Sequence, residues 1–264
     1  MKNISEMDPN LLSGLVGIFT DIDDTLSSAG KLTADAFAAL WQLHDAGIKT
    51  IVVTGRPAGW CDHIARFWPV TAVVGENGGF YFHHDGNKLG RYYLYNNAER
   101  AEFRKKLESV RDKILKTVHG ASVASDQSYR EYDIAIDFCE DVPRLPQKEV
   151  MRIKTIFEDA GANAKISSIH VNGWYGEFDK LTTSIKCAKD LLGVDVKKHP
   201  ESFVYCGDSP NDEPMFAFFP LSVGMANIQP FVPMLKSLPS FVTNKACGAG
   251  FREVANVILQ AQSQ

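Results

Sequence analysis

The stretch IFTDIDDTLS, residues 18–27, places three aspartates within four positions, just after the apolar run LVGIF. Carboxylates this close repel one another, so the cluster costs stability unless a cation or a shared proton offsets the charge. The residues LVGIFT at 15–20 are typical of a buried strand. In an extended segment, side chains two positions apart share a face, so Asp21 and Asp23 project together while Asp24 points away. A turn or a helix cap is the alternative, because aspartate is favoured at both.

The segments around this cluster predict a parallel α/β sheet. A helix expected at 34–46 ends at Gly47, and the apolar run IKTIVVT follows as a second strand. Further elements of the same kind are a helix at AGWCDHIARFW, a strand at 71–75, late strands at 201–207, 220–225 and 240–243, and a final helix at GFREVANVILQAQ. Near-continuous Val and Ile runs separated by helices are typical of a Rossmann-like, doubly wound parallel sheet covered on both faces.

The middle of the chain follows a different pattern. An Asp-Gly turn between the aromatic runs of FYFHHDGNKLGRYYLY predicts an antiparallel hairpin. Two amphipathic helices at 97–118 and 147–160, and strands in EYDIAIDF, KISSIH and VNGWYGEF, follow it. We therefore expect an α+β domain at 81–179, inserted into an α/β core domain formed by residues 1–80 and 180–264.

Composition narrows the class of partner. The chain has 264 residues, a formal net charge of -4 and a sequence pI of about 6.0, so charge gives no case for nucleic acid or a membrane surface. A small molecule is the expected partner. The five cysteines are widely spaced and form no CxxC pair, which indicates neither a disulfide framework nor a zinc site and favours a reducing cytoplasm. The first ten residues lack an apolar run, so we expect neither a signal peptide nor a membrane anchor.

Polar residues follow two other strands at the same expected edge of the sheet. Thr54 and Gly55 end the second strand, where a hydroxyl and a free backbone N–H suit an anion, although a capped strand-to-helix turn is the alternative. The late strand in VYCGDSPNDEP ends in a glycine that permits close backbone approach and in three oxygen-bearing residues that suit a hard cation, namely Asp208, Asn211 and Asp212. Lys180 opens a helix that re-enters the core; alone, it is typical of a solvated surface charge.

In chain order, these features resemble the haloacid dehalogenase (HAD) superfamily of phosphohydrolases. DIDDT at 21–25, Thr54, Lys180 and GDSPND at 207–212 match the first to fourth motifs of that superfamily. The insert resembles its type C2 cap, and the C2B form in particular, which occurs in Cof-type sugar phosphatases, sucrose-phosphate phosphatases and phosphomannomutases. Two positions depart from the pattern: Asp24 stands where many members have glycine, and Leu181 stands where glycine usually follows the motif lysine.

The resemblance implies a Mg²⁺-dependent phosphomonoester hydrolase. Asp21 would be the nucleophile that forms an aspartyl-phosphate, and Asp23 would be the acid and base, with neighbouring carboxylates expected to help it keep a proton. The metal would be held by Asp21, the backbone carbonyl of Asp23 and Asp208, with waters steadied by Asp212. The phosphate-binding set would be Thr54, Gly55, Lys180 and Asn211, the last of these orienting Lys180 or a neighbouring aspartate. Asp24 is expected to form the turn.

The expected substrate is a sugar phosphate or a similar small phosphorylated metabolite. Candidate contacts to the leaving group are Arg56 and Asn77 in the core and His170 and Asn172 in the cap. The two cap residues could equally be plain strand and turn positions, and for Trp174 packing inside the cap is the favoured interpretation. A phosphomutase of the phosphomannomutase type is the alternative enzyme. A receiver module, which phosphorylates an aspartate as a switch, is a distant alternative, because it lacks the paired DxD, the GDSxND motif and a large insert.

Overall fold

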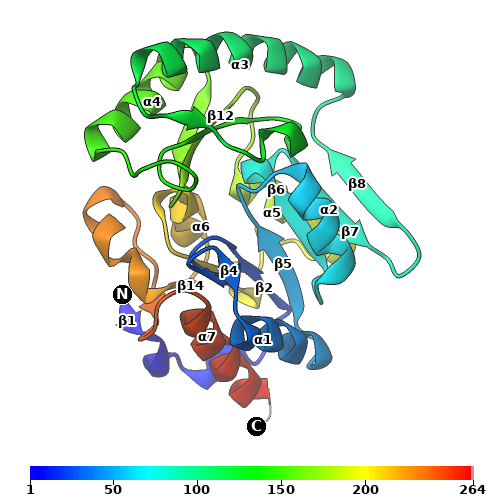
Figure 1. The fold of residues 1–264 in the computed structure, drawn as a ribbon. Helices are drawn as coiled ribbons and strands as arrows, with labels where there is room; N and C mark the ends of the chain where they lie inside the picture. The colour runs from blue at the N-terminus through cyan, green and yellow to red at the C-terminus, as the bar shows by residue number, and fades with distance from the viewer. Residues whose placement is uncertain (263–264) are drawn as a thin grey trace.

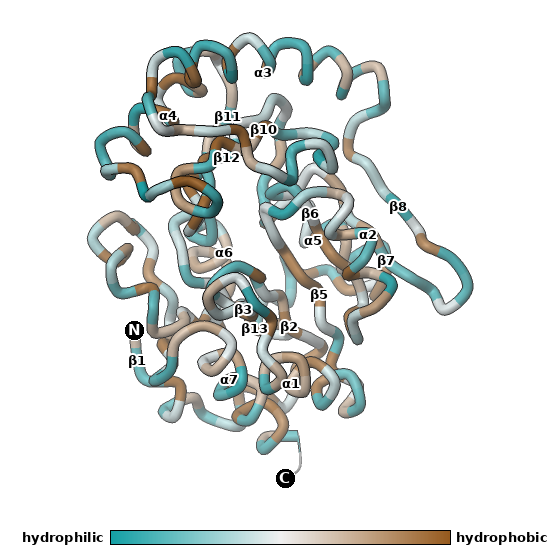
Figure 2. Tube along the Cα trace, viewed as in Figure 1, coloured by the Kyte–Doolittle hydropathy of each residue, from teal (hydrophilic) through white to brown (hydrophobic). Residues whose placement is uncertain are grey.

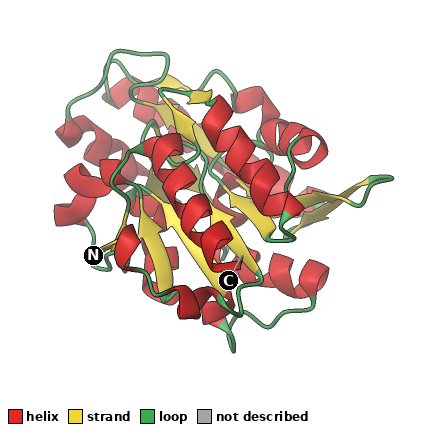
Figure 3. Ribbon diagram, turned by 90° about the horizontal axis from the view of Figure 1, so that it is seen from below, coloured by secondary structure: helices red, strands yellow, loops and turns green. Residues whose placement is uncertain are grey.

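A nine-stranded sheet forms the centre of the core domain in this computed structural model, which describes residues 1–262 (Figure 1). Its strands, in spatial order, are β1 (Lys2–Asn3), β15 (Phe241–Val242), β14 (Leu221–Gly224), β13 (Phe203–Gly207), β2 (Gly17–Thr20), β5 (Lys49–Val53), β6 (Ala72–Gly75), β7 (Phe80–His84) and β8 (Leu89–Tyr93). All pairs from β1 to β6 are parallel, as expected for a doubly wound sheet. Helices lie on both sides of it when the molecule is viewed from below (Figure 3).

Alternating apolar residues explain the two covered faces. On β2, Ile18 packs with residues of α1 (Ala34–Asp45), α2 (Ala58–Phe67) and α7 (Cys247–Gln262) on one face. The next residue, Phe19, packs on the opposite face with α5 (Lys180–Leu192) and α6 (Glu213–Phe218). Because successive side chains of a strand point to opposite faces, a continuous apolar run buries both. Within residues 1–262, no helix has both the length and the apolar character that crossing a bilayer requires.

The predicted antiparallel hairpin is present, but it belongs to the core sheet rather than to the insert. Strand β7 pairs antiparallel with β6, and β8 pairs antiparallel with β7. Phe80 and Phe82 pack on one face of the sheet and Tyr81 on the other, so the strand is buried on both sides. The expected boundary at residue 81 is therefore wrong for these strands, and we propose that the inserted domain begins after Tyr93.

The inserted segment builds a second layer above the carboxyl ends of the core strands (Figure 1). A four-stranded antiparallel sheet has the order β11 (Asn163–Ile166), β12 (His170–Trp174), β10 (Ile134–Asp137) and β9 (Ser122–Val123). Helices α3 (Asn97–Thr117) and α4 (Gln147–Asp159) share a separate apolar cluster with one face of this sheet. Most residues of α3 are hydrophilic, as the teal colour of its trace shows (Figure 2). The segment therefore has its own core, as expected for a domain.

Several short elements lie between the main helices and strands. A short hairpin of β3 (Ser27–Ser28) and β4 (Lys31–Leu32) follows the aspartate cluster. The 3₁₀ helices are Ile4–Glu6, Pro9–Leu12, Glu76–Gly78, Gln127–Tyr129, Pro200–Ser202, Pro210–Asp212 and Ala226–Met234.

Glu76, which follows β6, ties the inserted domain to the core. Its carboxylate accepts hydrogen bonds from the backbone N–H groups of Glu131, Tyr132 and Asp133 in the insert, at 2.6–3.2 Å. It also accepts one from the N–H of Ala58, at the start of α2, at 3.0 Å. The side chain is fully buried. We call these contacts the Glu76 latch; they join the inserted domain to the core.

Replacing Glu76 with Gln is expected to flatten the pH dependence of folding. Burial raises the pKa of Glu76 from 4.5 to about 7, and the carboxylate of Asp133 adds to the effect. A carboxyl group with a higher pKa in the folded than in the unfolded chain stabilises the fold below pH 4.5, and that contribution is lost as the pH rises to 7. Across this window, the free energy of unfolding of the wild type should therefore fall by roughly 2–3 kcal/mol more than that of Glu76→Gln.

Denaturant unfolding of both proteins across this pH window measures the difference. Glu108→Gln, at an exposed position of α3, is the matched control and should keep the wild-type slope. Parallel slopes for the wild type and Glu76→Gln would show that the buried carboxyl does not hold a proton in the native state.

Candidate active site

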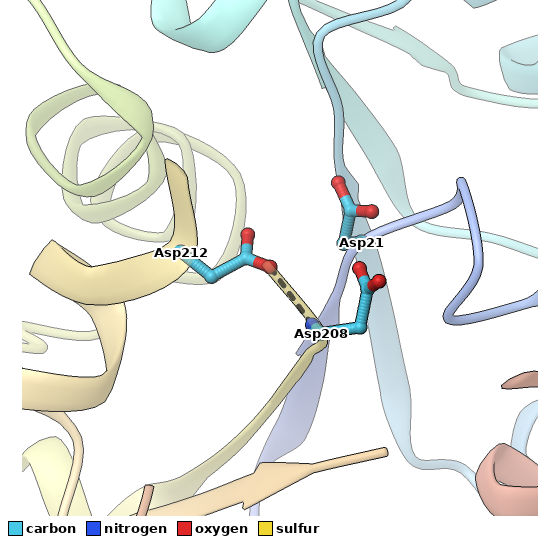
Figure 4. Close-up of side chains that lie close together, drawn as sticks. All are labelled: Asp21, Asp208 and Asp212. Atoms are coloured by element: carbon cyan, nitrogen blue, oxygen red, sulfur yellow. Dashed lines mark hydrogen bonds between the residues drawn. The ribbon is translucent and has the colours of Figure 1, made fainter. Parts of the chain in front are cut away.

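The first and fourth motifs meet where β2 and β13 end side by side. The backbone N–H of Asp21 donates to the carbonyl of Cys206 at 2.9 Å, which continues the pairing of the two strands. Asp21, Asp208 and Asp212 each offer a carboxylate oxygen, and these oxygens all lie within 4.8 Å of one another (Figure 4). All three side chains are buried. The sequence expectation that these motifs converge at one edge of the sheet is confirmed.

Gly207 permits the closest approach in this cluster. A Cβ atom at this position would lie 2.5 Å from Oδ2 of Asp212, so a larger residue would displace that carboxylate. With glycine there, Oδ2 accepts hydrogen bonds from the N–H groups of Asp208 and Ser209 at 2.9 and 3.2 Å. The predicted close approach at Gly207 is therefore present, and it fixes the orientation of Asp212.

Lys180 is the first residue of α5, and its side chain enters the acidic cluster. Its Nζ donates to Oδ1 of Asp21 at 2.7 Å and to Oδ1 of Asp212 at 2.6 Å, with 2% of the residue exposed. The helix starts here because the side chain of Asp179 caps it by accepting from the N–H of Thr182 at 2.7 Å. The solvated surface charge is therefore the wrong interpretation for Lys180.

The turn NGG, residues 77–79, packs against the start of α5. Gly78 has a φ of 114°, and a Cβ on it would lie 2.1 Å from the carbonyl oxygen of Asp179. The hydroxyl of Thr183 donates to the carbonyl of Gly78 at 2.6 Å. The chain therefore needs glycine here to bring α5, and with it Lys180, against the end of the sheet.

The acidic cluster has more carboxyl groups than positive charges to balance them. Burial raises the pKa of Asp21 to about 7, although the Lys180 ammonium opposes the shift. Burial also raises the pKa of Asp208 well above its usual value, with Asp212 adding to the effect. Burial alone would lower the pKa of Lys180, but Asp21 and Asp212 together hold it above its ordinary range. One ammonium is thus set against three buried carboxyl groups, an arrangement that suits a further cation.

The donor set fits a hard divalent ion. Carboxylate oxygens are the ligands that Mg²⁺ prefers, and three of them converge here. The two oxygens of Asp208 accept from Thr25 at 3.3 Å and from Asn227 at 3.1 Å, which orients the group. Both oxygens of Asp212 are already engaged by protein donors, including Lys180 and the hydroxyl of Tyr205. Each oxygen of Asp212 accepts two such bonds, whereas each oxygen of Asp208 accepts one, at 3.1–3.3 Å. Lys180 engages one oxygen of Asp21. Asp21 and Asp208 are therefore better placed than Asp212 to contact a metal directly.

Thr54 lies at the end of β5, next to this cluster, and is fully buried. Its Oγ1 accepts a hydrogen bond from the backbone N–H of Arg56 at 3.0 Å. A hydroxyl that accepts in this way keeps its own hydrogen free to donate. Thr54, with the neighbouring Gly55, can therefore present donors to an anion, as predicted.

Asp23 is held by Arg56, a residue predicted to contact the substrate. Nε of Arg56 lies 3.1 and 3.0 Å from the two carboxylate oxygens of Asp23, and Nη2 lies 2.8 Å from Oδ1. Nη2 also donates to Glu140 of the inserted domain at 2.8 Å, and Nη1 lies 3.5 Å from Asp126. All three guanidinium nitrogens thus contact protein carboxylates, and the nearest charge to Asp23 is a cation rather than the crowding carboxylates that we expected.

A small cavity lies between the motif residues and the inserted domain. Its core side is lined by Asp21, Asp23, Gly55, Arg56, Ser209 and Asn211, and its cap side by Ser167, Ser168, Ile169, His170 and Asn172. Asn211 accepts a hydrogen bond from the hydroxyl of Ser209 at 2.8 Å. Thr54, Lys180, Asp208 and Asp212 do not line it and are buried. The structure therefore brings together most residues that the motifs predicted.

The predicted leaving-group contacts are only partly placed at this cavity. His170 lines it, with Nε2 2.8 Å from Oε2 of Glu140. Asn172 lines it too, but its amide donates to Asp133 at 2.7 Å. Asn77 does not line the cavity. A Cβ on Gly55 would lie 3.3 Å from the amide nitrogen of Asn77, so Asn77 packs against the phosphate loop, Thr54–Arg56. Trp174 is buried and stacks on Phe178 with ring centroids 5.5 Å apart, so it is packed as expected, but in the apolar cluster of the core sheet rather than in the cluster of the cap.

Several residues at the site had no sequence-based prediction. Glu140, Ser168 and Tyr205 belong to no motif, although a tyrosine inside the apolar run FVYCG signals a buried polar partner. Asp24 adopts a φ of 58°, in line with its predicted place in the turn. A second cavity of about 320 Å³ adjoins the first and shares Asp23, Arg56, Ser168 and Ile169 with it; its other walls include Asp24, Ser27, Cys139 and Glu140.

A family model described as haloacid dehalogenase-like hydrolase matches residues 18–201 of the chain. The chain is 25% identical over 249 residues to a protein of Methanobrevibacter smithii named phosphoglycolate phosphatase, with 89% of this chain and 95% of the relative covered. It is 27% identical over 248 residues to a phosphoglycolate phosphatase of Pyrobaculum aerophilum, with 92% and 95% covered.

Solved structures share the fold. Protein 0175 of Thermoplasma acidophilum superposes with a TM-score of 0.69 at 16% identity, over 92% of this chain and 98% of that one. The sucrose-phosphatase of a Synechocystis species, solved with sucrose and phosphate, superposes with a TM-score of 0.64 at 14% identity, over 92% and 97%. At these identities the likeness concerns the fold alone.

Proposed function

This chain is a phosphatase that belongs to the haloacid dehalogenase-like hydrolase family, and we propose that it hydrolyses small phosphomonoesters through a phosphorylated Asp21. The observation that carries the proposal is the buried cluster at the ends of β2 and β13. It combines a carboxylate nucleophile, an ammonium 2.7 Å away and two further carboxylates that could hold a cation. Phosphoryl transfer needs these elements, because the negative charge of the ester must be neutralised while the nucleophile attacks.

In the first step, a carboxylate oxygen of Asp21 attacks phosphorus, and the bond from phosphorus to the ester oxygen breaks. Asp23 gives its proton to the departing oxygen, so the leaving group departs as a neutral alcohol. Lys180 and the hydroxyl of Thr54 hold the oxygens of the transferring group. The product of this step is an acyl phosphate on Asp21.

In the second step, water attacks the acyl phosphate. Asp23, now a carboxylate, takes a proton from that water, and inorganic phosphate leaves with Asp21 restored. Arg56 supports the second step by holding the carboxylate of Asp23 at the cavity wall.

Asp21, the backbone carbonyl of Asp23 and Asp208 would hold Mg²⁺, and Asp212 would orient the waters that remain on it. When bound, the ion neutralises phosphoryl charge and aligns the ester for attack. The open oxygen of Asp21 and the fixed carboxylate of Asp208 support this assignment.

The second cavity supports a neutral, hydroxylated leaving group such as a sugar. Its walls carry the carboxylates of Asp23, Asp24 and Glu140 and the hydroxyls of Ser27 and Ser168. Sugar hydroxyls can donate to such carboxylates, whereas the carboxylate of glycolate would meet like charge. Arg56 is the cation on this wall, and its nitrogens already face protein carboxylates. The preference would therefore differ from the activity for which the curated relatives are named.

A panel of phosphomonoesters tests both the Mg²⁺-dependent phosphatase activity and the proposed preference for a hydroxylated leaving group. With Mg²⁺ present, we expect kcat/KM for hexose phosphates to exceed that for 2-phosphoglycolate by about 10-fold or more, and EDTA to stop phosphate release from both. Equal or higher kcat/KM for 2-phosphoglycolate would contradict the leaving-group proposal. Isomerisation of a hexose phosphate on addition of a bisphosphorylated sugar, with little free phosphate, would favour the phosphomutase instead.

A further inference from the structure

Arg130 of the inserted domain reaches into the core directly behind the phosphate loop, Thr54–Arg56. Its side chain is fully buried, and Nη1 donates to the backbone carbonyl of Gly55 at 2.9 Å. It does not line the cavity beside the motif residues. The guanidinium is anchored by Asp126, at 3.0 Å from Nη2, and by Asp133, at 3.0 Å from Nη1.

The partner of Arg130 belongs to a peptide unit that also contacts Thr54. The carbonyl of Gly55 and the N–H of Arg56 lie on opposite sides of one planar peptide group. Arg130 binds the oxygen of that group, and Oγ1 of Thr54 accepts from its N–H at 3.0 Å. Because the group is planar, fixing its oxygen also fixes the direction of its N–H.

That direction decides what the hydroxyl of Thr54 can do. While Oγ1 accepts from the loop N–H, its own hydrogen is free for an anion in the cavity. If the peptide rotates, this bond is lost and the hydroxyl can turn toward a backbone acceptor instead.

Two further contacts make the arrangement specific. Asp126 accepts from Arg130 and also lies 3.5 Å from Nη1 of Arg56, so consecutive residues of the phosphate loop are held from the inserted domain. The Glu76 latch holds Glu131, Tyr132 and Asp133, the residues that follow Arg130, against the core. Arg130 is thereby fixed at both its backbone and its guanidinium.

We propose that Arg130 is a positioning residue for phosphate binding, which acts from the inserted domain through the Gly55–Arg56 peptide on the hydroxyl of Thr54. The inference rests on the proposed function. It also assigns the inserted domain a role in holding the phosphoryl group, beyond any contact that it makes with the leaving group.

A double-mutant cycle with inorganic phosphate as the inhibitor tests the proposal. Arg130→Gln and Thr54→Val should each raise the inhibition constant of phosphate by about 10-fold, because each removes one donor's contribution to a charged group. In the double variant, the inhibition constant of phosphate should also rise by about 10-fold rather than 100-fold, because both changes act on the one hydroxyl of Thr54. Arg100→Gln is the matched control: it removes an ion pair of 2.6 Å to Glu131 and should leave the constant within about two-fold.

The outcomes separate a positioning role from a structural one. The proposal would be overturned if the two increases in the inhibition constant of phosphate multiplied in the double variant. It would also be overturned if Arg130→Gln left that constant unchanged. If Arg130→Gln does not fold, Arg130→Lys keeps the charge beside Asp126 and Asp133 but not the fork that reaches Gly55, and the same cycle applies to it. A wild-type protein that hydrolyses no phosphomonoester would overturn the proposed function itself. An active wild type in which the effects of the two substitutions multiply would overturn this inference alone.

Discussion

Replacing Asp21 with Asn is expected to lower kcat for phosphomonoester hydrolysis by about four orders of magnitude or more while leaving the fold intact. An amide oxygen is a poor nucleophile toward phosphorus, so the first step loses its attacking group. The side chain keeps its shape, and its oxygen can still accept from Lys180, which lies 2.7 Å away in the wild type. Since burial raises the pKa of Asp21 to about 7, a neutral residue there should cost little stability.

Steady-state phosphate release and thermal unfolding, measured on the same preparations, check this result. Asp159→Asn, at the exposed end of α4, is the matched control, because it makes the same change of side chain away from both cavities. The control should keep kcat within a few-fold of the wild type. Turnover by Asp21→Asn within about 10-fold of the wild type would exclude Asp21 as the nucleophile.

Replacing Asp208 with Asn should raise the Mg²⁺ concentration needed for half-maximal activity by about 10- to 100-fold. The change removes one negative charge from the group of three carboxylates that could hold the ion. Asn keeps an oxygen that can still accept from Thr25 or Asn227, so the orientation of the side chain is largely retained. The loss should therefore fall on metal affinity more than on folding.

Magnesium titrations of activity, paired with calorimetric titrations of the metal in the absence of substrate, measure the effect. Asp159→Asn is again the control and should bind Mg²⁺ as the wild type does. An unchanged magnesium requirement in Asp208→Asn, with activity reduced at every concentration, would remove Asp208 from the metal site.

The core was predictable because its signals are local. Strands buried on both faces appear as continuous apolar runs, and the adjacent Ile18 and Phe19 do pack on opposite faces of the sheet. The helix predicted at 34–46 is α1, Ala34–Asp45, and the long helix predicted at 97–118 is α3, Asn97–Thr117. The convergence of Asp21 and Asp208 followed from the rule that parallel strands end at a common edge.

The hairpin of β7 and β8 was assigned to the wrong domain because its pairing is tertiary. An Asp-Gly turn predicts a hairpin but does not say which sheet the hairpin joins. The run Phe80, Tyr81 and Phe82 is apolar on both faces, which is the signal of a strand buried in the larger sheet.

The contacts between the two domains could not be predicted from the sequence for a similar reason. Glu76 and Arg130 are far apart in the chain, and neither lies in a periodic pattern. The same holds for Arg56, whose charge suggested a substrate contact until Asp23 and Glu140 proved to be its partners. Buried ion pairs between separate segments depend on the packed geometry, which local sequence rules do not contain.

In the proposed mechanism, the phosphoryl group passes through the carboxylate of Asp21. This transfer is tested most directly by quenching the wild-type enzyme during turnover of a phosphomonoester with Mg²⁺, reducing it with borohydride and mapping the peptides by mass spectrometry. An acyl phosphate is reduced by borohydride to an alcohol, so the account predicts reduced side chains at Asp21 and unmodified Asp23, Asp208 and Asp212. Reduction at one of those three residues, or no reduction at Asp21 in an enzyme that is turning over, would contradict it.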